Sequence, residues 1–287
     1  MSNATDRTNC HFAEQLAHAE KLNRSLLCVG LDPDPARFPA GMRGDPTCIF
    51  EFCRQIVDAT HDLAIAFKPQ IAYFAAQRAE DQLERLIAHI HAMAPEVPVI
   101  LDAKRGDIGS TAQQYAREAF ERYGADAVTL SPFMGFDSIE PYLQYPGKGL
   151  FLLCRTSNPG GADLQAQRLA GGDMLFEHIA RLASGTWNRN RQLGLVVGAN
   201  FPAELKRVRD LAANLPLLIP GVGAQGGDAG ATVRAAWRGE NGQTVAPIVV
   251  NSARAIIYAS SGADFAAAAR RAALEARQAL NAGRATA

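Results

Sequence analysis

The sequence predicts a (β/α)₈ barrel, an α/β fold in which eight parallel strands alternate with helices and close into a ring. Two observations lead to this fold class. Short, continuously apolar runs recur along the whole chain and are separated by longer segments of helical character; such runs are typical of parallel strands buried on both faces. Polar residues stand at the end of most runs, and barrel enzymes build their active sites at the carboxyl ends of their strands.

The elements follow one another in the order that a barrel requires. Amphipathic stretches such as 79–91 and 110–123 lie between the runs, and the alanine-rich segment 263–280 suits a last barrel helix with a frayed tail. Residues before Leu26 are expected to form a helix that closes the barrel bottom. The segment 156–192 is long for one crossover, so we expect an active-site loop and then the fifth helix from Asp173. The eight apolar runs occupy residues 26–32, 63–69, 97–104, 127–132, 149–155, 193–199, 217–223 and 247–253.

Length and composition fit one barrel domain over residues 1–287. A chain of 287 residues and 30.7 kDa can bury a substantial core without disulfides or structural metals. No linker, repeat or low-complexity block divides it. Lysine plus arginine total 29 and aspartate plus glutamate total 29, so the formal charge is zero. A nucleic-acid-binding protein needs a basic excess or patch to collect phosphates, so that class is disfavoured.

The cysteines and the chain start predict a cytoplasmic protein. The cysteines are odd in number and scattered, without a C-x-x-C pair, which indicates neither a disulfide framework nor a zinc site. The first residues lack the apolar core of a secretory signal, and no apolar stretch approaches the ~18 residues of a membrane helix. The six histidines fall in predicted helices or near their ends, away from the strand ends, so we expect no metal site.

The most informative segment is D-A-K-R-G-D, residues 102–107. Positions two apart in a strand face the same way, so Asp102 and Lys104 are expected to project together into the barrel mouth. Asp107 follows where the strand has become a loop, and Lys68, from the preceding strand, would neighbour Asp102. The result is an alternating array of lysines and aspartates that compensate each other's buried charge.

Two interpretations of this array stay open at the level of the residues. It is either a purely structural ion-pair network or a site for a reaction in which negative charge develops beside a lysine ammonium. In the second case the ammonium stabilises a carbanion and then donates the proton that quenches it, while the aspartates keep the ammonium in place and charged.

A second motif, G-V-G-A-Q-G at 221–226, follows the seventh apolar run. It matches a dinucleotide fingerprint, but it does not open a first βαβ unit as that fingerprint does. In barrels, the loops after strands seven and eight commonly form a phosphate cup from backbone N–H groups. Arg254, just past the eighth run, could grip such a phosphate, so phosphate binding is favoured over an unpartnered surface arginine.

These residues resemble the orotidine 5′-phosphate decarboxylase family, and within it the longer bacterial and mycobacterial-type branch (type 2). The likeness extends from Leu26 to Tyr258 in family order. It is carried by F-K-P-Q-I-A-Y-F, I-L-D-A-K-R-G-D-I-G-S-T, S-P-F-M-G-F-D-S, R-T-S-N-P-G, P-G-V-G-A-Q-G-G-D and V-N-S-A-R-A-I-I-Y.

The resemblance implies decarboxylation of orotidine 5′-monophosphate to uridine 5′-monophosphate, the last step of de novo pyrimidine nucleotide synthesis, without metal or organic cofactor. By this resemblance Lys68, Asp102, Lys104 and Asp107 are the catalytic tetrad. Lys104 would donate the proton to C6 of the pyrimidine. Asp107 is expected to reach the active site of the other subunit of a homodimer.

The resemblance also assigns substrate contacts. Asp32 and Thr111 resemble ribose-hydroxyl contacts, and Ser157 resembles the residue that hydrogen-bonds the pyrimidine amide edge. One departure is Asn200, which stands where the family pattern has threonine and puts one local contact in doubt.

The phosphate is assigned to the last two loops. Gln225 and Arg254 resemble phosphate ligands, and the turn from Gly223 would supply backbone donors.

Two rival functions remain. A 3-keto-L-gulonate 6-phosphate decarboxylase shares D-x-K-x-x-D but uses magnesium, and it is expected to carry an acidic ligand where this chain has Lys68. A non-catalytic nucleotide-binding barrel is the second rival, and the intact tetrad argues against it.

Overall fold

The computed structural model describes residues 11–222, 227–240, 243–244 and 246–286. Its main sheet contains eight strands in the order β2-β1-β10-β7-β6-β5-β4-β3, and neighbouring strands in this order pair in parallel. All eight apolar runs therefore become strands, as predicted. The strands are β1 Leu27–Leu31, β2 Ala66–Pro69, β3 Ile100–Arg105, β4 Ala127–Leu130, β5 Gly149–Arg155, β6 Leu193–Val197, β7 Leu217–Pro220 and β10 Ile248–Ser252.

The two outer strands of this order, β2 and β3, meet through isolated parallel bridges. Phe67 pairs with Val99, and Gln70 pairs with Asp102. These bridges close the sheet into the predicted barrel, so that the carboxyl ends of all eight strands surround one opening.

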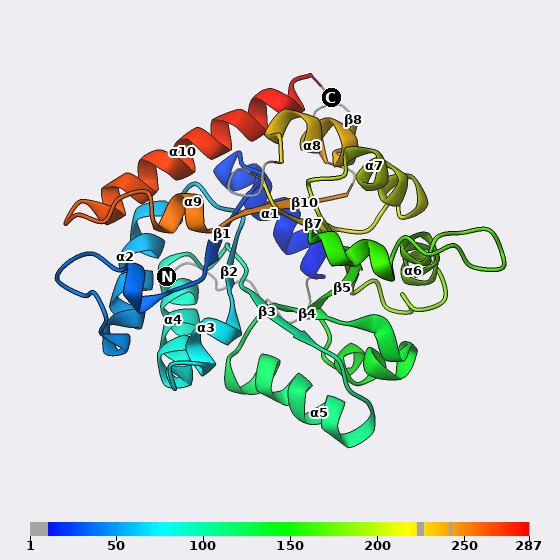
Figure 1. The fold of residues 1–287 in the computed structure, drawn as a ribbon, viewed down its shortest axis with the longest axis horizontal. Coiled ribbons are helices and arrows are strands. Elements are labelled where there is room, and N and C mark those ends of the chain that lie inside the picture. Colours follow the sequence, from blue (N-terminus) through cyan, green and yellow to red (C-terminus); the bar gives the residue numbers. More distant parts are fainter. Residues whose placement is uncertain (1–10, 223–226, 241–242, 245, 287) are drawn as a thin grey trace, which may run out of the picture.

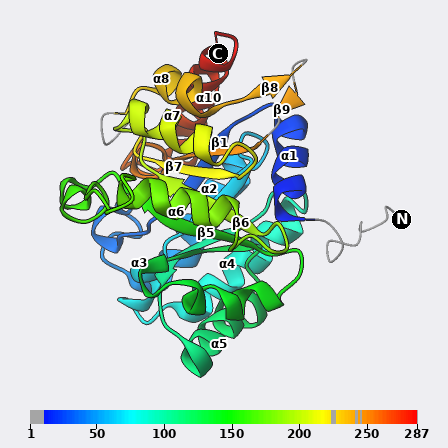
Figure 2. The same cartoon turned by 90° about the vertical axis from the view of Figure 1, so that its right-hand side faces the viewer.

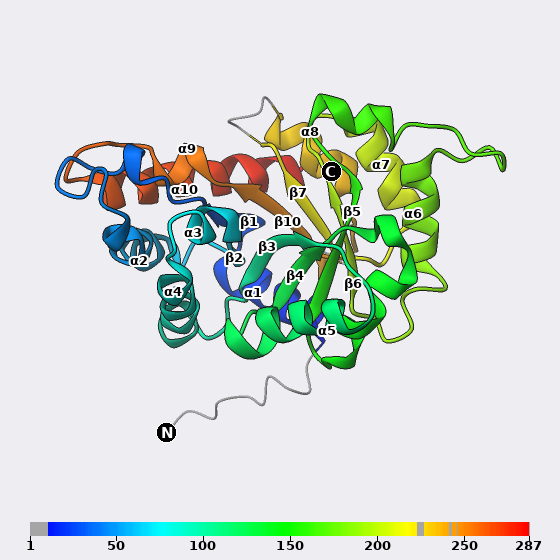
Figure 3. The same cartoon turned by 60° about the horizontal axis from the view of Figure 1, so that its bottom comes forward.

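Helices cover the outside of the strands (Figures 1 and 3). The predicted segment 110–123 forms α5 and a short π-helical turn, Glu118–Arg122, and the fifth barrel helix begins close to the predicted Asp173. The helices are α1 Phe12–Asn23, α2 Ile49–Thr60, α3 Ile71–Ala75, α4 Glu80–Met93, α5 Gly109–Arg117, α6 Leu175–Ser184, α7 Pro202–Leu211, α8 Ala229–Ala236, α9 Arg254–Ile257 and α10 Phe265–Arg284. A small antiparallel hairpin, β8 Gly239–Glu240 with β9 Gln243–Thr244, was not predicted.

Helix α1 closes the amino end of the barrel, as the sequence predicts (Figure 2). Its buried residues Phe12, Leu16 and Ala19 pack against the innermost strand residues, which include Phe151. The rings of Phe12 and Phe151 meet edge to face, with centroids 5.8 Å apart. Gly149 allows this approach, because a Cβ there would lie 2.3 Å from the Phe12 ring. The barrel interior is therefore apolar below the polar strand ends.

In the described part of the chain, no helix is both long and apolar enough to cross a membrane.

The closing role of α1 predicts a large stability cost at Leu16, which is 0% exposed. Leu16→Ala should lower the free energy of unfolding by about 2–5 kcal/mol, because it leaves a cavity at the barrel bottom. The measurement is urea unfolding. Leu22→Ala is the matched control, since Leu22 lies on the same helix with 56% exposure and should change stability by less than about 0.5 kcal/mol. Equal losses in both variants would contradict the closing role.

Candidate active site

A cavity of about 510 Å³ opens at the carboxyl ends of the strands. Its floor is formed by inward-facing strand residues, and one wall is formed by the segment after β5, which supports the predicted active-site loop. The lining residues that matter below are Asp32, Lys68, Asp102, Lys104, Thr129, Ser157, Gln165 and Asn251.

Asp102 joins the two predicted lysines. Its Oδ2 lies 2.8 Å from Nζ of Lys68, and its Oδ1 lies 2.6 Å from Nζ of Lys104. The Lys68 side chain is 6% exposed and that of Asp102 is 10% exposed, whereas Lys104 is 46% exposed. Lys68 is thus almost fully buried in the cavity floor, and Lys104 reaches into the cavity.

The Asp102 carboxylate and the Lys68 ammonium hold each other in the charged form. Burial alone would raise the pKa of Asp102, but Lys68 and Lys104 hold that pKa well below its usual value. Burial would likewise lower the pKa of Lys68, but Asp102 and Asp32 raise it above its usual value. The three-residue cluster of Lys68, Asp102 and Lys104 therefore carries one net positive charge in a poorly solvated place, where charges interact strongly.

Lys104 reaches Asp102 by a route that strand alternation does not describe. Leu101 pairs with Val128 and Arg105 pairs with Leu130, so the residues between them form a bulge in β3 opposite a single residue of β4. Lys104 has φ +49°, the left-handed region, which costs a residue with a side chain about 1–2 kcal/mol. The predicted meeting of the two side chains is confirmed, but a bulge and a left-handed residue produce it.

Asp32 and Ser157 line the same cavity, as expected. Burial raises the pKa of Asp32, against the lowering effect of Lys68. Among the residues that the structure describes, the Oδ1 atoms of Asp32 and of Asn251 are buried without a hydrogen-bond partner. Both are acceptors in the wall of the cavity, where a ligand hydroxyl could bind.

The segment that carries Ser157 is held from both sides. Gln165 Oε1 accepts a hydrogen bond from the Thr156 N–H at 2.8 Å, and the buried Arg155 pairs with Glu204 at 2.6 Å. A Cβ on Gly198 would lie 2.8 Å from the Ser157 Cα, so only glycine lets the segment approach β6 this closely.

Three predicted residues do not line this cavity. Asp107 lies beyond β3 and accepts a hydrogen bond from the Ile108 N–H at 2.8 Å, and Thr111 is exposed on α5. Arg254 is exposed at the start of α9, yet its charge lowers the pKa of Asp32, so it lies within electrostatic reach. Gly223 and Gln225 lie outside the described residues.

Six polar residues of the cavity were not assigned as site residues from the sequence: Gln70, Thr129, Thr156, Asn158, Gln165 and Asn251. The signal for Asn251 was present, since it interrupts an apolar run as Lys68 and Asp102 do, whereas Thr129 is an ordinary residue for a strand. Gln165 had no such signal, because it lies in an irregular loop.

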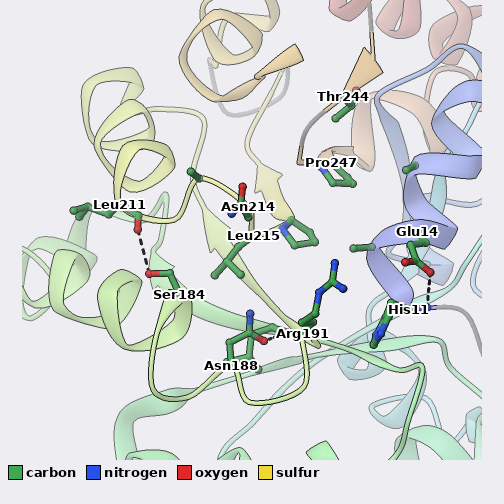
Figure 4. Close-up of a pocket in the computed structure, with 15 residues that line it drawn as sticks. His11, Glu14, Ser184, Asn188, Arg191, Leu211, Asn214, Leu215, Thr244 and Pro247 are labelled. Atoms are coloured by element: carbon green, nitrogen blue, oxygen red, sulfur yellow. Dashed lines mark hydrogen bonds between the residues drawn. The ribbon is translucent and has the colours of Figure 1, made fainter. Parts of the chain in front are cut away.

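A larger cavity, of about 740 Å³, lies at the opposite end of the barrel, between α1 and the loops that precede β6 and β7 (Figure 4). Its acidic residue, Glu14, accepts a hydrogen bond from the His11 N–H at 3.1 Å and so caps α1. Arg191 points into it from the loop before β6. The cluster of Lys68, Asp102 and Lys104 is at the other end, so the chemistry belongs to the smaller cavity.

Within the described ranges, no group of three or more histidine, cysteine, aspartate or glutamate residues is placed to hold a metal ion.

Fold and site together define an α/β barrel enzyme with a lysine–aspartate–lysine cluster at its strand ends. The family model described as "Orotidine 5'-phosphate decarboxylase / HUMPS family" matches residues 25–272. The chain belongs to this family.

Individual members of the family are similar to this chain over almost its whole length. The chain is 72% identical over 276 residues to the orotidine 5′-phosphate decarboxylase of Methylibium petroleiphilum, covering 95% of this chain and 99% of that protein. It is also 72% identical over 282 residues to the enzyme of the same name from Albidiferax ferrireducens, covering 95% and 98%. Among solved structures, the OMP decarboxylase of Leishmania donovani superposes with a TM-score of 0.82 at 38% identity, covering 96% of this chain and 100% of that one.

The lowered pKa of Asp102 predicts an acid-dependent stability. A carboxyl group whose folded pKa lies below its unfolded value, about 3.9, stabilises the fold fully above that value and loses this contribution as the pH falls through the folded pKa. Asp102→Asn should therefore be less stable than wild type at about pH 7, and the difference should shrink towards about pH 3. Urea unfolding at both values measures it. Asp137→Asn, at an exposed carboxylate, is the control, and a gap that stays constant with pH would contradict the assignment.

Proposed function

We propose that Lys104 is the proton donor in the decarboxylation of orotidine 5′-monophosphate to uridine 5′-monophosphate, the reaction of this family. The supporting observation is the contrast between the two lysines on Asp102: the Lys104 side chain is 46% exposed and that of Lys68 is 6% exposed. Only Lys104 is both anchored on the carboxylate and open to the cavity. Lys68 instead keeps Asp102 charged and in place.

The proposed reaction needs no electron acceptor. The bond between C6 and the carboxylate breaks, carbon dioxide leaves, and the electron pair stays on C6. The ammonium of Lys104 stabilises this carbanion and transfers one proton to C6, and the resulting amine regains a proton from water. Because Asp102 orients the ammonium before substrate binds, little reorganisation is needed as the charge develops.

We assign the remaining contacts by the family pattern. Asp32 would bind a ribose hydroxyl, and its buried, unpartnered Oδ1 supports this role. Ser157 would bind the pyrimidine amide edge, and its place in the cavity wall supports that. Arg254, Gln225 and the turn from Gly223 would bind the phosphate.

We further propose that the active unit is a homodimer in which Asp107 and Thr111 belong to the partner's site. Both residues lie outside the cavity of their own chain. The loop after β3 also carries Ile108 with 49% exposure, and the neighbouring loop after β4 carries Phe133 with 76% exposure. The two loops leave the sheet side by side, since the Ser131 N–H, directly after β4, donates to the carbonyl of Arg105, the last residue of β3, at 2.7 Å. Exposed apolar side chains on adjacent loops are typical of an interaction surface.

The metal-dependent rival is less well supported. It is expected to carry an acidic ligand at the end of β2, where this chain has the buried cation Lys68. An ammonium there repels a divalent cation, so we propose a reaction without metal or cofactor.

The whole chain is proposed to form one barrel domain and to act in the cytoplasm. The free thiols of the described cysteines, Cys28, Cys48, Cys53 and Cys154, support a reducing compartment.

The direct test is the loss of ultraviolet absorbance of orotidine 5′-monophosphate on adding the purified protein. Wild type should be active and stay active after EDTA treatment. Lys104→Ala should lose more than about 1,000-fold in kcat, because proton donor and stabilising charge vanish together. Lys206→Ala, which removes an exposed lysine of α7, is the control and should match wild type. Near-normal kcat in Lys104→Ala, or EDTA inactivation reversed by magnesium, would contradict the proposal.

Mixed dimers test the shared site. Lys104→Ala and Asp107→Ala homodimers should each be nearly inactive. In a mixed dimer one site combines both lesions and the other contains neither, because the intact lysine and the intact aspartate come from opposite chains. Random reassortment makes about half of the dimers mixed, so roughly a quarter of all sites should regain wild-type activity.

The subunits are exchanged in mild denaturant and dimer formation is verified before the assay. If verified mixed dimers are no more active than the separate variants, Asp107 acts within its own chain.

A further inference from the structure

Thr129 lies on β4 at the floor of the active-site cavity, and the assignments above give it no role. It is 1% exposed and lines the cavity beside Asp102 and Lys104. Strands β3 and β4 are neighbours in the sheet (Figure 1). By their register, Thr129 is the residue of β4 that lies opposite the bulge of β3. Its side chain therefore meets the backbone that carries the proposed proton donor.

The hydroxyl of Thr129 makes three hydrogen bonds, which uses its full capacity. Its oxygen accepts from the Ala103 N–H at 3.0 Å and from the Lys104 N–H at 2.9 Å. Two accepted bonds occupy both lone pairs, so the single hydroxyl hydrogen is left for Asp102 Oδ1, 2.9 Å away. The Thr129 oxygen is therefore the acceptor from both N–H groups, and its hydroxyl is the donor to Asp102.

These bonds replace a piece of missing sheet ladder. In a regular parallel pair, β4 carbonyls would accept alternate N–H groups of β3. The bulge takes Ala103 and Lys104 out of that register, and one side-chain oxygen binds both of their N–H groups instead. The same oxygen thus holds Lys104 at φ +49°, the conformation that returns its ammonium to Asp102.

We infer that Thr129 is a positioning residue for the decarboxylation, which holds the Lys104 backbone and the Asp102 carboxylate in the geometry that aims the ammonium at the reacting carbon. The inference rests on the proposed function of Lys104. Thr129 acts through its hydroxyl, and its methyl group only fills space. Its loss lowers the rate of the chemical step, while the proposed phosphate and ribose contacts lie elsewhere and keep substrate binding close to normal.

Two pairs of variants isolate the hydroxyl. Wild type and Thr129→Val differ by the hydroxyl at nearly constant volume, and Thr129→Ser and Thr129→Ala differ by it in a smaller side chain. Thr60→Val is the matched control, because Thr60 is buried like Thr129 and its hydroxyl donates to the Ile56 carbonyl at 2.7 Å, on α2 outside the site. For each variant, kcat and KM for orotidine 5′-monophosphate, the dissociation constant of uridine 5′-monophosphate and the thermal midpoint are measured.

Thr129→Val and Thr129→Ala should lose about 100-fold in kcat, as expected when one preorganised hydrogen bond is removed, with KM and product affinity changed by less than about threefold. Thr129→Ser should restore kcat to within about fivefold of wild type, and Thr60→Val should keep it.

The role is overturned if Ser and Ala variants have equal kcat, if KM rises while kcat is kept, or if both variants without a hydroxyl unfold while Thr129→Ser stays folded. A wild-type protein without decarboxylase activity would instead overturn the proposed function. Wild-type activity with no difference within either pair would overturn the role of Thr129 alone.

Discussion

The carboxylate of Asp102 binds two ammonium groups and one hydroxyl, and both the site and the closure of the barrel depend on this contact. A buried anion is stable only when it is paired and hydrogen-bonded. The partners come from three strands: Lys68 from β2, Lys104 from β3 itself and Thr129 from β4. The Asp102 backbone also bridges to Gln70, across the seam that closes the sheet. Closing the seam and assembling the charged cluster are therefore coupled.

The apolar interior beneath the cluster of Lys68, Asp102 and Lys104 explains why these charges interact strongly. Helix α1 seals the amino end with Leu16 and its neighbours, and the innermost strand residues stack above it. Water is thereby kept from the underside of Lys68, which stays charged because Asp102 lies 2.8 Å away. The cavity side is open, so Lys104 is solvated until a substrate displaces the water. Binding then transfers an already oriented ammonium into a medium in which its charge acts more strongly.

Most of the fold could be predicted from the sequence, because parallel barrel strands are buried on both faces and appear as unbroken apolar runs. The charged site residues could be predicted because lysine and aspartate stand out in such runs. The bulge at Lys104 could not, since it depends on the register between β3 and β4, which is a contact between distant segments. Thr129 was missed because a β-branched residue inside an apolar run is ordinary for a strand. The hairpin of β8 and β9 has strands too short for a periodic signal.

The charge balance of the site links the two proposals. Lys68, Asp102 and Lys104 carry one net positive charge within a single chain, and among the described residues Asp102 alone forms an ion pair with Lys104. This contact holds the Lys104 ammonium from one side. In the proposed dimer, Asp107 of the second chain would add a carboxylate from the opposite side, which would restrain the ammonium further. Thr129 binds the backbone N–H of Lys104 at 2.9 Å, and Asp107 would restrain the charged end of its side chain, so the two proposals concern different parts of one residue.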